Sequence, residues 1–384
     1  MKVLIAPDSF KENLTAMEVA TAIETGIKRV LPNARCVKVP LADGGEGTVQ
    51  ALVDATGGRI VKKNVVGPLG NRVSARYGLL GDGATAVIEM AEASGLPLVP
   101  KNKRDPLSTT TYGTGELMMD ALRRGAKSII IGLGGSATVD GGAGMAQALG
   151  VKFVKKNGKP VIGYCAGGSL DTIAKIDVEG IDPHFRDAMV IIASDVDNPL
   201  CGARGAAQVF GPQKGATLEM VRVLDRNLKH FGTLIRSQLG TDVLSLPGSG
   251  AAGGLGAGLI AFTGATMTRG IDLVIKATGL AKHLKDADLV ITGEGRVDFQ
   301  TAFGKTPSGV AALAKKHRVP VVAIGGSLAD DATSVYAHGI DGLESAAAKN
   351  MDLETALKNS RKHLANASER VIRLILIGRR MKKK

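Results

Sequence analysis

A chain of 384 residues with 44% hydrophobic and 22% charged side chains suits two globular domains, each large enough to form a core without metals or disulfides. The 51 glycines follow no period, which excludes collagen, and no apolar run approaches the roughly 18 residues of a membrane helix. Basic residues exceed acidic ones by 49 − 36 = 13, which favours anionic ligands, but 3% aromatic side chains and no tryptophan argue against nucleic-acid binding.

The cysteines and the N-terminus bear on localisation. Cys36, Cys165 and Cys201 are an odd number, lie far apart and form no CxxC pair, which argues against a disulfide framework or a zinc site. The first apolar run, residues 3–6, is too short for a signal peptide. We therefore expect a cytoplasmic protein without a membrane partner.

Strands and helices alternate along most of the chain. Short apolar runs that end in glycine or polar clusters predict strands at 3–6, 37–41, 129–133, 189–193, 289–292 and 321–324. Periodic apolar residues predict helices at 15–30, 221–239, from 306, and 353–376. Thr15 with Glu18 forms a capping box, and Thr306 with Pro307 fits an N-cap followed by proline at the first helical position. This alternation predicts parallel sheets covered on both faces.

Residues 58–90 differ, because polar and apolar residues alternate there between glycine turns, which predicts antiparallel hairpins. We therefore expect an α/β fold of two domains. Residues 1–60 and 285–384 would form a flavodoxin-like domain with a parallel sheet. Residues 61–284 would form an inserted α/β domain that contains the hairpins, with the active site in the cleft between the two.

The predicted strands end in loops that combine glycine with acidic or hydroxyl residues. Glycine lets backbone N–H groups approach an anion, hydroxyls bind phosphate, and carboxylates hold Mg²⁺. In open parallel sheets, ligands bind beyond the carboxyl ends of the strands. The loops are residues 7–11, 43–48, 134–142, 194–198, 293–298 and 325–327.

Two segments, 43–52 and 140–149, share Asp, three Gly, Gln, Ala and Leu, and both are predicted to open helices. Either they are two anion sites at helix N-termini, or they are ordinary glycine-rich helix entries. Gly304-Lys305-Thr306 resembles the end of a P-loop, but Phe299 occupies the position of its first glycine. Lys305 either reaches phosphate or is a solvated residue before a helix cap.

Other motifs are ambiguous when taken alone. The glycine-rich run 253–258 follows no predicted strand, so close helix packing explains it as well as a dinucleotide fingerprint does. Asp195 and Asp197 would face the same side if their strand continued through Asp197, and could then hold Mg²⁺ or act as a base. All six histidines are interpreted as surface or helix residues. Local chemistry thus predicts an α/β protein that binds a phosphorylated ligand with Mg²⁺.

The motifs, taken in order, resemble the type 1 glycerate kinase family over nearly the whole chain. The matching segments are 6–11, 42–48, 132–144, 194–200, 209–216, 253–258 and 292–305. The resemblance implies an ATP- and Mg²⁺-dependent kinase of D-glycerate that yields 2-phosphoglycerate. It also implies two α/β domains, one of them flavodoxin-like.

On these motif positions we predict the site residues. Asp195 would orient or deprotonate the attacked hydroxyl, and Arg296 or Lys11 would clamp the glycerate carboxylate. The predicted metal ligands are Asp195, Asp197 and Glu294. The predicted ATP-binding residues are Gly134, Gly135, Ser136, Gly141, Gly142, Lys214, Gly293 and Lys305. The predicted substrate-binding residues are Asp8, Ser9, Asp43, Gly44 and Gly45.

The expected partners are therefore D-glycerate and ATP, with no nucleic acid, and a homodimer is left open. Three rival functions stay open at this point. They are a kinase of another small hydroxy acid, an NAD-dependent dehydrogenase of the Rossmann type, and a non-enzymatic sensor of a sugar acid.

Overall fold

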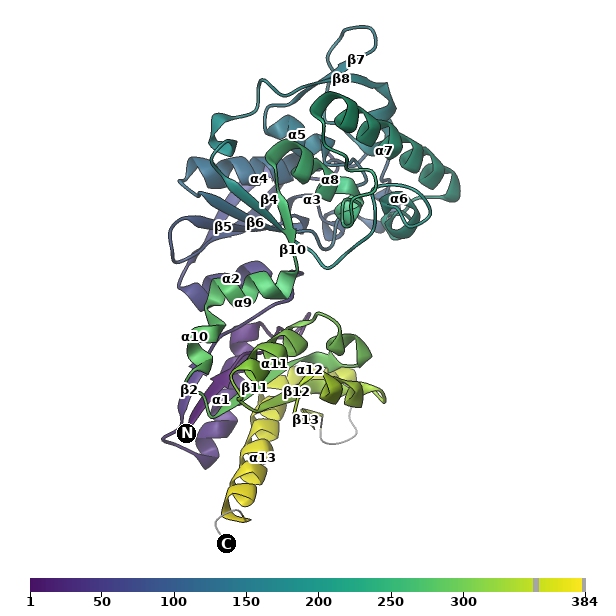
Figure 1. Ribbon diagram of the computed structural model, residues 1–384. Helices are drawn as coiled ribbons and strands as arrows, with labels where there is room; N and C mark the ends of the chain where they lie inside the picture. The colour runs from purple at the N-terminus through teal and green to yellow at the C-terminus, as the bar shows by residue number, and fades with distance from the viewer. Residues whose placement is uncertain (348–351, 382–384) are drawn as a thin grey trace. The chain divides into compact units, whose positions relative to one another are not determined.

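The computed structural model of this chain describes residues 1–347 and 352–381. The chain divides into two compact units, one formed by Met1–Gly57 with Ile271–Lys384 and the other by Gly58–Gly270. Each unit has its own sheet and helices, so the predicted α/β class is confirmed (Figure 1). The sequence placed the boundaries near 60 and 285, whereas the second boundary of these units lies after Gly270.

The sheet of the first unit is parallel throughout. In the order in which its strands are hydrogen-bonded, they are β2 (Arg35–Lys38), β1 (Lys2–Ile5), β11 (Leu289–Val297), β12 (Val321–Leu328) and β13 (Gly342–Ser345). Counted within this unit, that order is 2-1-3-4-5, the order of flavodoxin-like sheets. The predicted flavodoxin-like domain is therefore present.

Helix α1 (Ala16–Val30) begins at the predicted capping box. The Thr15 side chain accepts a hydrogen bond from the Glu18 amide, and the Glu18 carboxylate accepts one from the Thr15 amide at 2.8 Å. Helix α13 (Ser360–Met381) packs closely on α1, because a Cβ on Gly26 would lie 1.9 Å from the Ala365 carbonyl oxygen. The two ends of the chain thus build one unit.

The C-terminal helix was predicted as one segment, 353–376, but it is two. Helix α12 (Leu353–Lys358) is capped by Asn359, and α13 begins at the next residue, Ser360. The Ser360 hydroxyl donates toward the Ala356 and Leu357 carbonyl oxygens, and such bonds compete with the backbone bonds of a continuous helix.

Strands β11 and β12 were expected to end before their glycine loops, and this was wrong. Both strands continue through the glycines, with Glu294 beside Gly325 and Arg296 beside Ser327. The glycines serve close strand contact, because a Cβ on Gly293 would lie 2.1 Å from the Ile324 carbonyl oxygen. Rigid strand, not loop, therefore holds Glu294 and Arg296.

The first unit also contains further helices. They are α2 (Thr48–Thr56), α9 (Gly270–Thr278), whose first residue belongs to the second unit, α10 (Leu280–Leu284), α11 (Thr306–Lys316), and the 3₁₀ helices η6 (Phe299–Ala302) and η7 (Ala332–His338). Both segments that were predicted to open helices do so, one at Thr48 and the other at Ala143.

The second unit has a mixed six-stranded sheet in the order β10-β9-β6-β5-β4-β3. The pairs β3–β4 and β4–β5 are antiparallel, which confirms the hairpins predicted between 58 and 90, and the other pairs are parallel. A separate ribbon pairs β7 with β8. The strands are β3 (Arg59–Val66), β4 (Arg72–Leu79), β5 (Thr85–Glu89), β6 (Ser128–Gly132), β7 (Lys152–Lys155), β8 (Ile173–Asp177), β9 (Met189–Ala193) and β10 (Thr266–Thr268).

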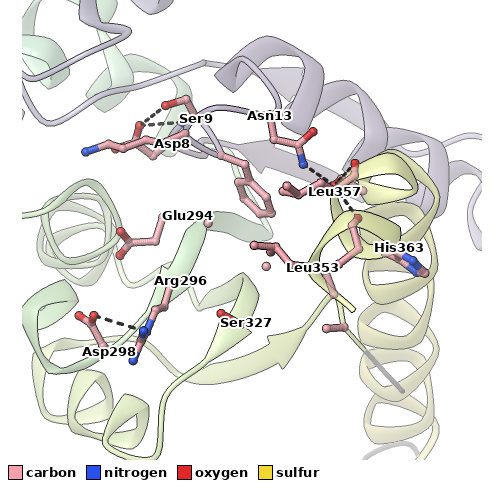
Figure 2. A pocket seen from close by; sticks show the side chains of 18 of the residues that line it. Asp8, Ser9, Asn13, Glu294, Arg296, Asp298, Ser327, Leu353, Leu357 and His363 are labelled. Carbon is pink, nitrogen blue, oxygen red and sulfur yellow. Dashed lines mark hydrogen bonds and ion pairs between the residues drawn. The ribbon is translucent and has the colours of Figure 1, made fainter. Parts of the chain in front are cut away.

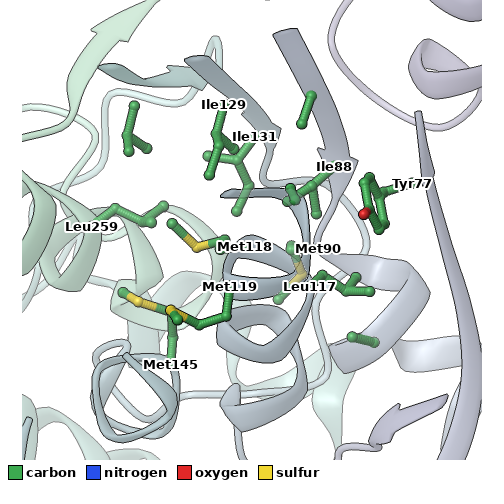
Figure 3. Packing of buried hydrophobic residues seen from close by; sticks show 14 of the residues in the cluster. Tyr77, Ile88, Met90, Leu117, Met118, Met119, Ile129, Ile131, Met145 and Leu259 are labelled. Atoms are coloured by element: carbon green, nitrogen blue, oxygen red, sulfur yellow. The ribbon is translucent and has the colours of Figure 1, made fainter. Parts of the chain in front are cut away.

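Part of the second unit packs around a core of aliphatic and methionine side chains, seen beside β5 and β6 in Figure 3. Close packing explains the glycine run at 253–258, since a Cβ on Gly253 would lie 1.9 Å from the Thr138 carbonyl oxygen. The helices are α3 (Ala91–Ser94), α4 (Tyr112–Arg123), α5 (Ala143–Ala148), α6 (Ala206–Phe210), α7 (Leu218–Leu239) and α8 (Ala251–Thr263). The 3₁₀ helices are η1 (Leu96–Leu98), η2 (Lys101–Lys103), η3 (Gly167–Thr172), η4 (Pro183–Phe185) and η5 (Pro212–Lys214).

Over the described part of the chain, no helix is long and apolar enough to span a membrane.

Candidate active site

A pocket of about 730 Å³ lies in the first unit, after the end of β1 and along the C-terminal parts of β11 and β12 (Figure 2). In a sheet of this order, the crevice between the first and third strands, here β1 and β11, is where ligands bind. Acidic side chains lie at one end of the pocket, and Leu353 and Leu357 lie at the other. The polar lining residues are Asp8, Ser9, Lys11, Asn13, Asp43, Glu294, Arg296, Asp298, Lys305, Ser327, Ser360 and His363.

Asp8 follows β1 and is 6% exposed. Its Oδ1 accepts a hydrogen bond from the Ser9 amide at 2.6 Å, and its Oδ2 accepts one from the Thr306 hydroxyl at 2.5 Å. Burial, with the nearby Asp43 carboxylate, raises the pKa of Asp8 to about 7. Asp8 is thus an oriented carboxyl group that gains or loses its proton near neutral pH.

Glu294 lies within β11, at the switch point of the sheet. Its Oε2 lies 3.5 Å from the Lys305 Nζ. Its Oε1 is buried and has no hydrogen-bond partner among the described residues. Burial raises the pKa of Glu294, and the Thr301 side chain and Lys305 each offset part of that shift. The free oxygen leaves Glu294 able to bind a cation or a donor group.

The basic residues of the pocket are more exposed than its acids. Arg296 follows Glu294 on the same face of β11, its side chain is 69% exposed, and its Nε lies 3.9 Å from an oxygen of Asp298. Lys11 is exposed. An exposed guanidinium in a long ion pair can exchange that contact for an incoming carboxylate.

Asp43 reaches the pocket from the loop before α2. Its Oδ1 accepts a hydrogen bond from the Gly45 amide at 3.0 Å, which closes a tight turn. Gly44, with φ +94°, supplies the left-handed conformation that this turn needs. Gly44 and Gly45 therefore shape the loop, and Asp43 lines the pocket.

The start of α11 differs from the prediction. Lys305, not Thr306, is the N-cap, and Pro307 occupies the second helical position. Thr306 cannot cap the helix because its hydroxyl is bound to Asp8. The Gly-Lys-Thr sequence thus fixes Asp8 through Thr306 and contacts Glu294 through Lys305.

Other predicted residues belong to the second unit. In the loop after β6, Gly134 and Gly135 are exposed, whereas Ser136 is buried. Lys214 is 2% exposed, and its Nζ lies 2.7 Å from both the Ser136 Oγ and the Thr138 carbonyl oxygen. Burial lowers the pKa of Lys214 to about 7, and the Asp140 carboxylate opposes this shift.

Packing accounts for Gly141 and Gly142, because Cβ atoms there would lie 2.9 Å from Phe231 and 3.0 Å from Gly258. Asp140, which precedes them, is fully buried and accepts hydrogen bonds from the amides of Thr111, Gly142 and Gly144. In the second of the two similar segments, residues 140–149, the aspartate therefore fixes the start of α5. A role for Gly141 and Gly142 in nucleotide binding stays a prediction.

The predicted metal ligands are divided between the units. Glu294 belongs to the first, and Asp195 and Asp197 follow β9 in the second. The two aspartates would share one face only if the strand continued through Asp197, but β9 ends at Ala193. Asp197 pairs with Arg204 at 3.2 Å, and an oxygen of Asp195 lies 4.0 Å from Arg269. Among the described residues, no three His, Cys, Asp or Glu side chains are grouped to hold a metal.

Several pocket residues were not selected from the sequence. Ser327, which lines the pocket, and Thr306, which binds the pocket residue Asp8, stood in noted glycine-containing motifs, so a rule that included every hydroxyl there would have found them. Asn13, which donates a hydrogen bond to Ser360, and His363 carry no local signal, because only the fold brings α13 beside the loop after β1.

A flavodoxin-order sheet with acids, lysine and arginine at its switch point defines an α/β enzyme site for small charged ligands. Residues 3–376 match the family model described as the glycerate kinase family. The chain belongs to this family, as the motifs predicted, and it is a glycerate kinase enzyme, that is, a phosphotransferase with an alcohol acceptor.

The similar proteins cover nearly the whole chain. It is 54% identical to "Glycerate kinase" of Halalkalibacterium halodurans, over 96% of this chain and 97% of that protein. It is 52% identical to "Glycerate 2-kinase" of Escherichia coli, over 99% of both. A crystal structure from Salmonella typhimurium LT2, provisionally named glycerate kinase 2, matches with a TM-score of 0.91, 52% identity and 99% of each chain covered.

Proposed function

We propose that this enzyme transfers the γ-phosphoryl group of ATP to D-glycerate and releases 2-phosphoglycerate and ADP. The observation that carries the proposal is the first-unit pocket, which unites a buried carboxyl with basic groups suited to a small hydroxy acid. The name of the Escherichia coli relative, "Glycerate 2-kinase", supports the 2-position.

The basic side chains Arg296 and Lys11 are proposed to hold the glycerate carboxylate, because both line the pocket and neither is buried. A guanidinium binds a carboxylate through two parallel hydrogen bonds. Ser9, Asp43 and the loop of Gly44 and Gly45 would position the hydroxyl groups. Phosphoryl transfer depends mainly on such positioning and on charge neutralisation.

Two carboxylates are candidates for orienting or deprotonating the attacked hydroxyl. The sequence singled out Asp195. The structure favours Asp8 as a second candidate, since Thr306 and the Ser9 amide fix its oxygens in the same pocket as Arg296. A base is most effective when its pKa lies near the working pH, as that of Asp8 does.

Mg²⁺ fits the proposed reaction. The buried, unpartnered Oε1 of Glu294 is the kind of oxygen that Mg²⁺ binds, and Asp195 and Asp197 are the other proposed ligands. Mg²⁺ is usually held by one or two carboxylates plus phosphate oxygens, so a cluster of three acids is not required. When bound, it would neutralise charge on the phosphates.

ATP is proposed to bind through the glycine-rich loop after β6, at Gly134, Gly135 and Ser136, and through Lys305. The N–H groups of exposed glycines can approach phosphate oxygens closely.

A cytoplasmic location is also part of this proposal. The three free cysteines support it, because free thiols suit a reducing environment.

Phosphorus NMR of the product formed from D-glycerate and ATP tests this function. We expect one new phosphomonoester signal that matches 2-phosphoglycerate, together with ADP. A signal for 3-phosphoglycerate would correct the position. ADP release with tartronate semialdehyde, lactate or tartrate, and none with D-glycerate, would replace the substrate.

A further inference from the structure

Lys214 is an unusual residue of the second unit, because its whole side chain is in the interior. It ends η5 and is 2% exposed, and its ammonium group contacts Ser136 and Thr138 in the loop after β6, each at 2.7 Å. Both acceptors are neutral oxygens. A buried ammonium group is costly unless it is hydrogen-bonded, and a methionine would fill the same space without that cost.

The other half of the same loop is fixed by a second buried charge. Asp140 accepts hydrogen bonds from the Thr111 hydroxyl at 2.7 Å and from the Gly142 amide at 3.0 Å. Lys214 and Asp140 thus anchor the loop on either side of Val139. What stays exposed is its tip, Gly134 and Gly135.

The tip has the properties of an anion site. Gly135 has φ +72°, a conformation that a residue with a side chain rarely adopts, so the loop depends on glycine for its shape. Gly134 and Gly135 are both exposed. A cation buried close to the loop is screened by salt far less than a surface lysine is.

We infer that Lys214 is a positioning residue, which holds Ser136 and the Gly134–Gly135 tip ready for a nucleotide phosphate and adds positive charge from inside the protein. It does not touch the nucleotide. Lys214 was predicted from the sequence to bind ATP, and its burial favours action through the loop instead. This inference rests on the proposed use of ATP.

The test uses the whole enzyme and the variants Lys214→Met, Ser136→Ala and their combination. We expect Lys214→Met to raise the KM for ATP, and the Kd for ADP measured by calorimetry, at least tenfold. The KM for D-glycerate should change less than twofold. Ser136→Ala should weaken ADP binding at least threefold alone and add nothing to Lys214→Met, because both disturb one contact. Lys229→Met, at an exposed site on α7, is the matched control.

Three outcomes would overturn the inference: a lower melting temperature of Lys214→Met with ADP affinity unchanged, equal losses for ATP and D-glycerate, or independent effects of the two substitutions. If Lys214→Met does not fold, Ser136→Ala decides alone, and unchanged ADP affinity contradicts the inference. Failure of the proposed function is distinguishable, because the wild-type enzyme would then bind no ADP or leave D-glycerate unphosphorylated.

Discussion

The two units each bury a charged group near the carboxyl end of a parallel strand, but they use it differently. In the first unit, Asp8 is bound to the Thr306 hydroxyl and lines an open pocket. In the second, Lys214 is bound to the Ser136 hydroxyl and is enclosed by the protein. Burial moves both pKa values to about 7, upward for the acid and downward for the base. The comparison shows that burial can bring the pKa of an acid or of a base close to neutral pH. The proposed roles differ, since Asp8 would act on the substrate and Lys214 would support a loop.

The largest expected effect comes from removing the carboxylate that acts on the hydroxyl. Asp8→Asn and Asp195→Asn are each predicted to lower kcat on the order of 10²-fold or more if the residue is the base, with the protein still folded. Steady-state kinetics and a melting curve of each variant measure this. Asp330→Asn, at an exposed site in the first unit, is the control. Wild-type turnover removes the residue concerned from the mechanism.

The next effect concerns substrate binding in the pocket. Arg296→Ala is predicted to raise the KM for D-glycerate about tenfold or more, and that for ATP much less, because a bidentate contact to the carboxylate is lost. Initial rates with each substrate varied in turn give both constants. An effect confined to ATP would move Arg296 to the phosphate site.

A smaller effect is expected on stability in the second unit. Gly253→Ala places a Cβ 1.9 Å from the Thr138 carbonyl oxygen at a residue with φ +71°, so the loop after β6 must shift. We expect a lower melting temperature and weaker ADP binding, measured by thermal denaturation and calorimetry. Gly264→Ala, where a Cβ meets open space although φ is +66°, separates backbone strain from the clash. Equal losses in both variants would contradict the role of that contact.

The smallest predicted effect is a pH dependence due to Asp8. Its folded pKa, about 7, lies above the ordinary aspartate value of 3.8, so between these values the unfolded chain has released a proton that the folded chain retains. The contribution of Asp8 to the free energy of unfolding is therefore largest at low pH and falls as the pH rises through that interval. The melting temperature of Asp8→Asn minus that of the wild type should grow from pH 4.5 to pH 7.5. A constant difference would show that the Asp8 pKa is ordinary.

The sequence predicted most of the fold because its signals are local. The capping box of α1, the hairpins after residue 58 and the strand–helix alternation each depend on neighbouring residues. The errors arose where distant segments meet. Glycines that looked like loops in β11 and β12 serve close strand contact, and Thr306 is bound to Asp8, 298 residues away. For the site, motifs identified Asp8, Asp43, Glu294 and Lys305, but not which of them share a pocket.

The prediction that the active site lies in the cleft between the two units stays a prediction, as do the roles of the individual site residues. What the structure adds is the grouping within each unit. The acids and bases of the pocket come from β11 and the residue after it, from the segments that follow β1 and β2, and from the start of α11. A sequence without an alignment cannot give that grouping, because it depends on strand order.

The interleaved chain path has a consequence for biosynthesis. Strand β1 pairs with β11, so one edge of the N-terminal strand has no neighbour until the ribosome has added residues 289–297. By then every residue of the inserted unit, 58–270, has been synthesised. Domains commonly fold in the order in which they emerge. Here the segment that emerges first belongs to the unit that is completed last.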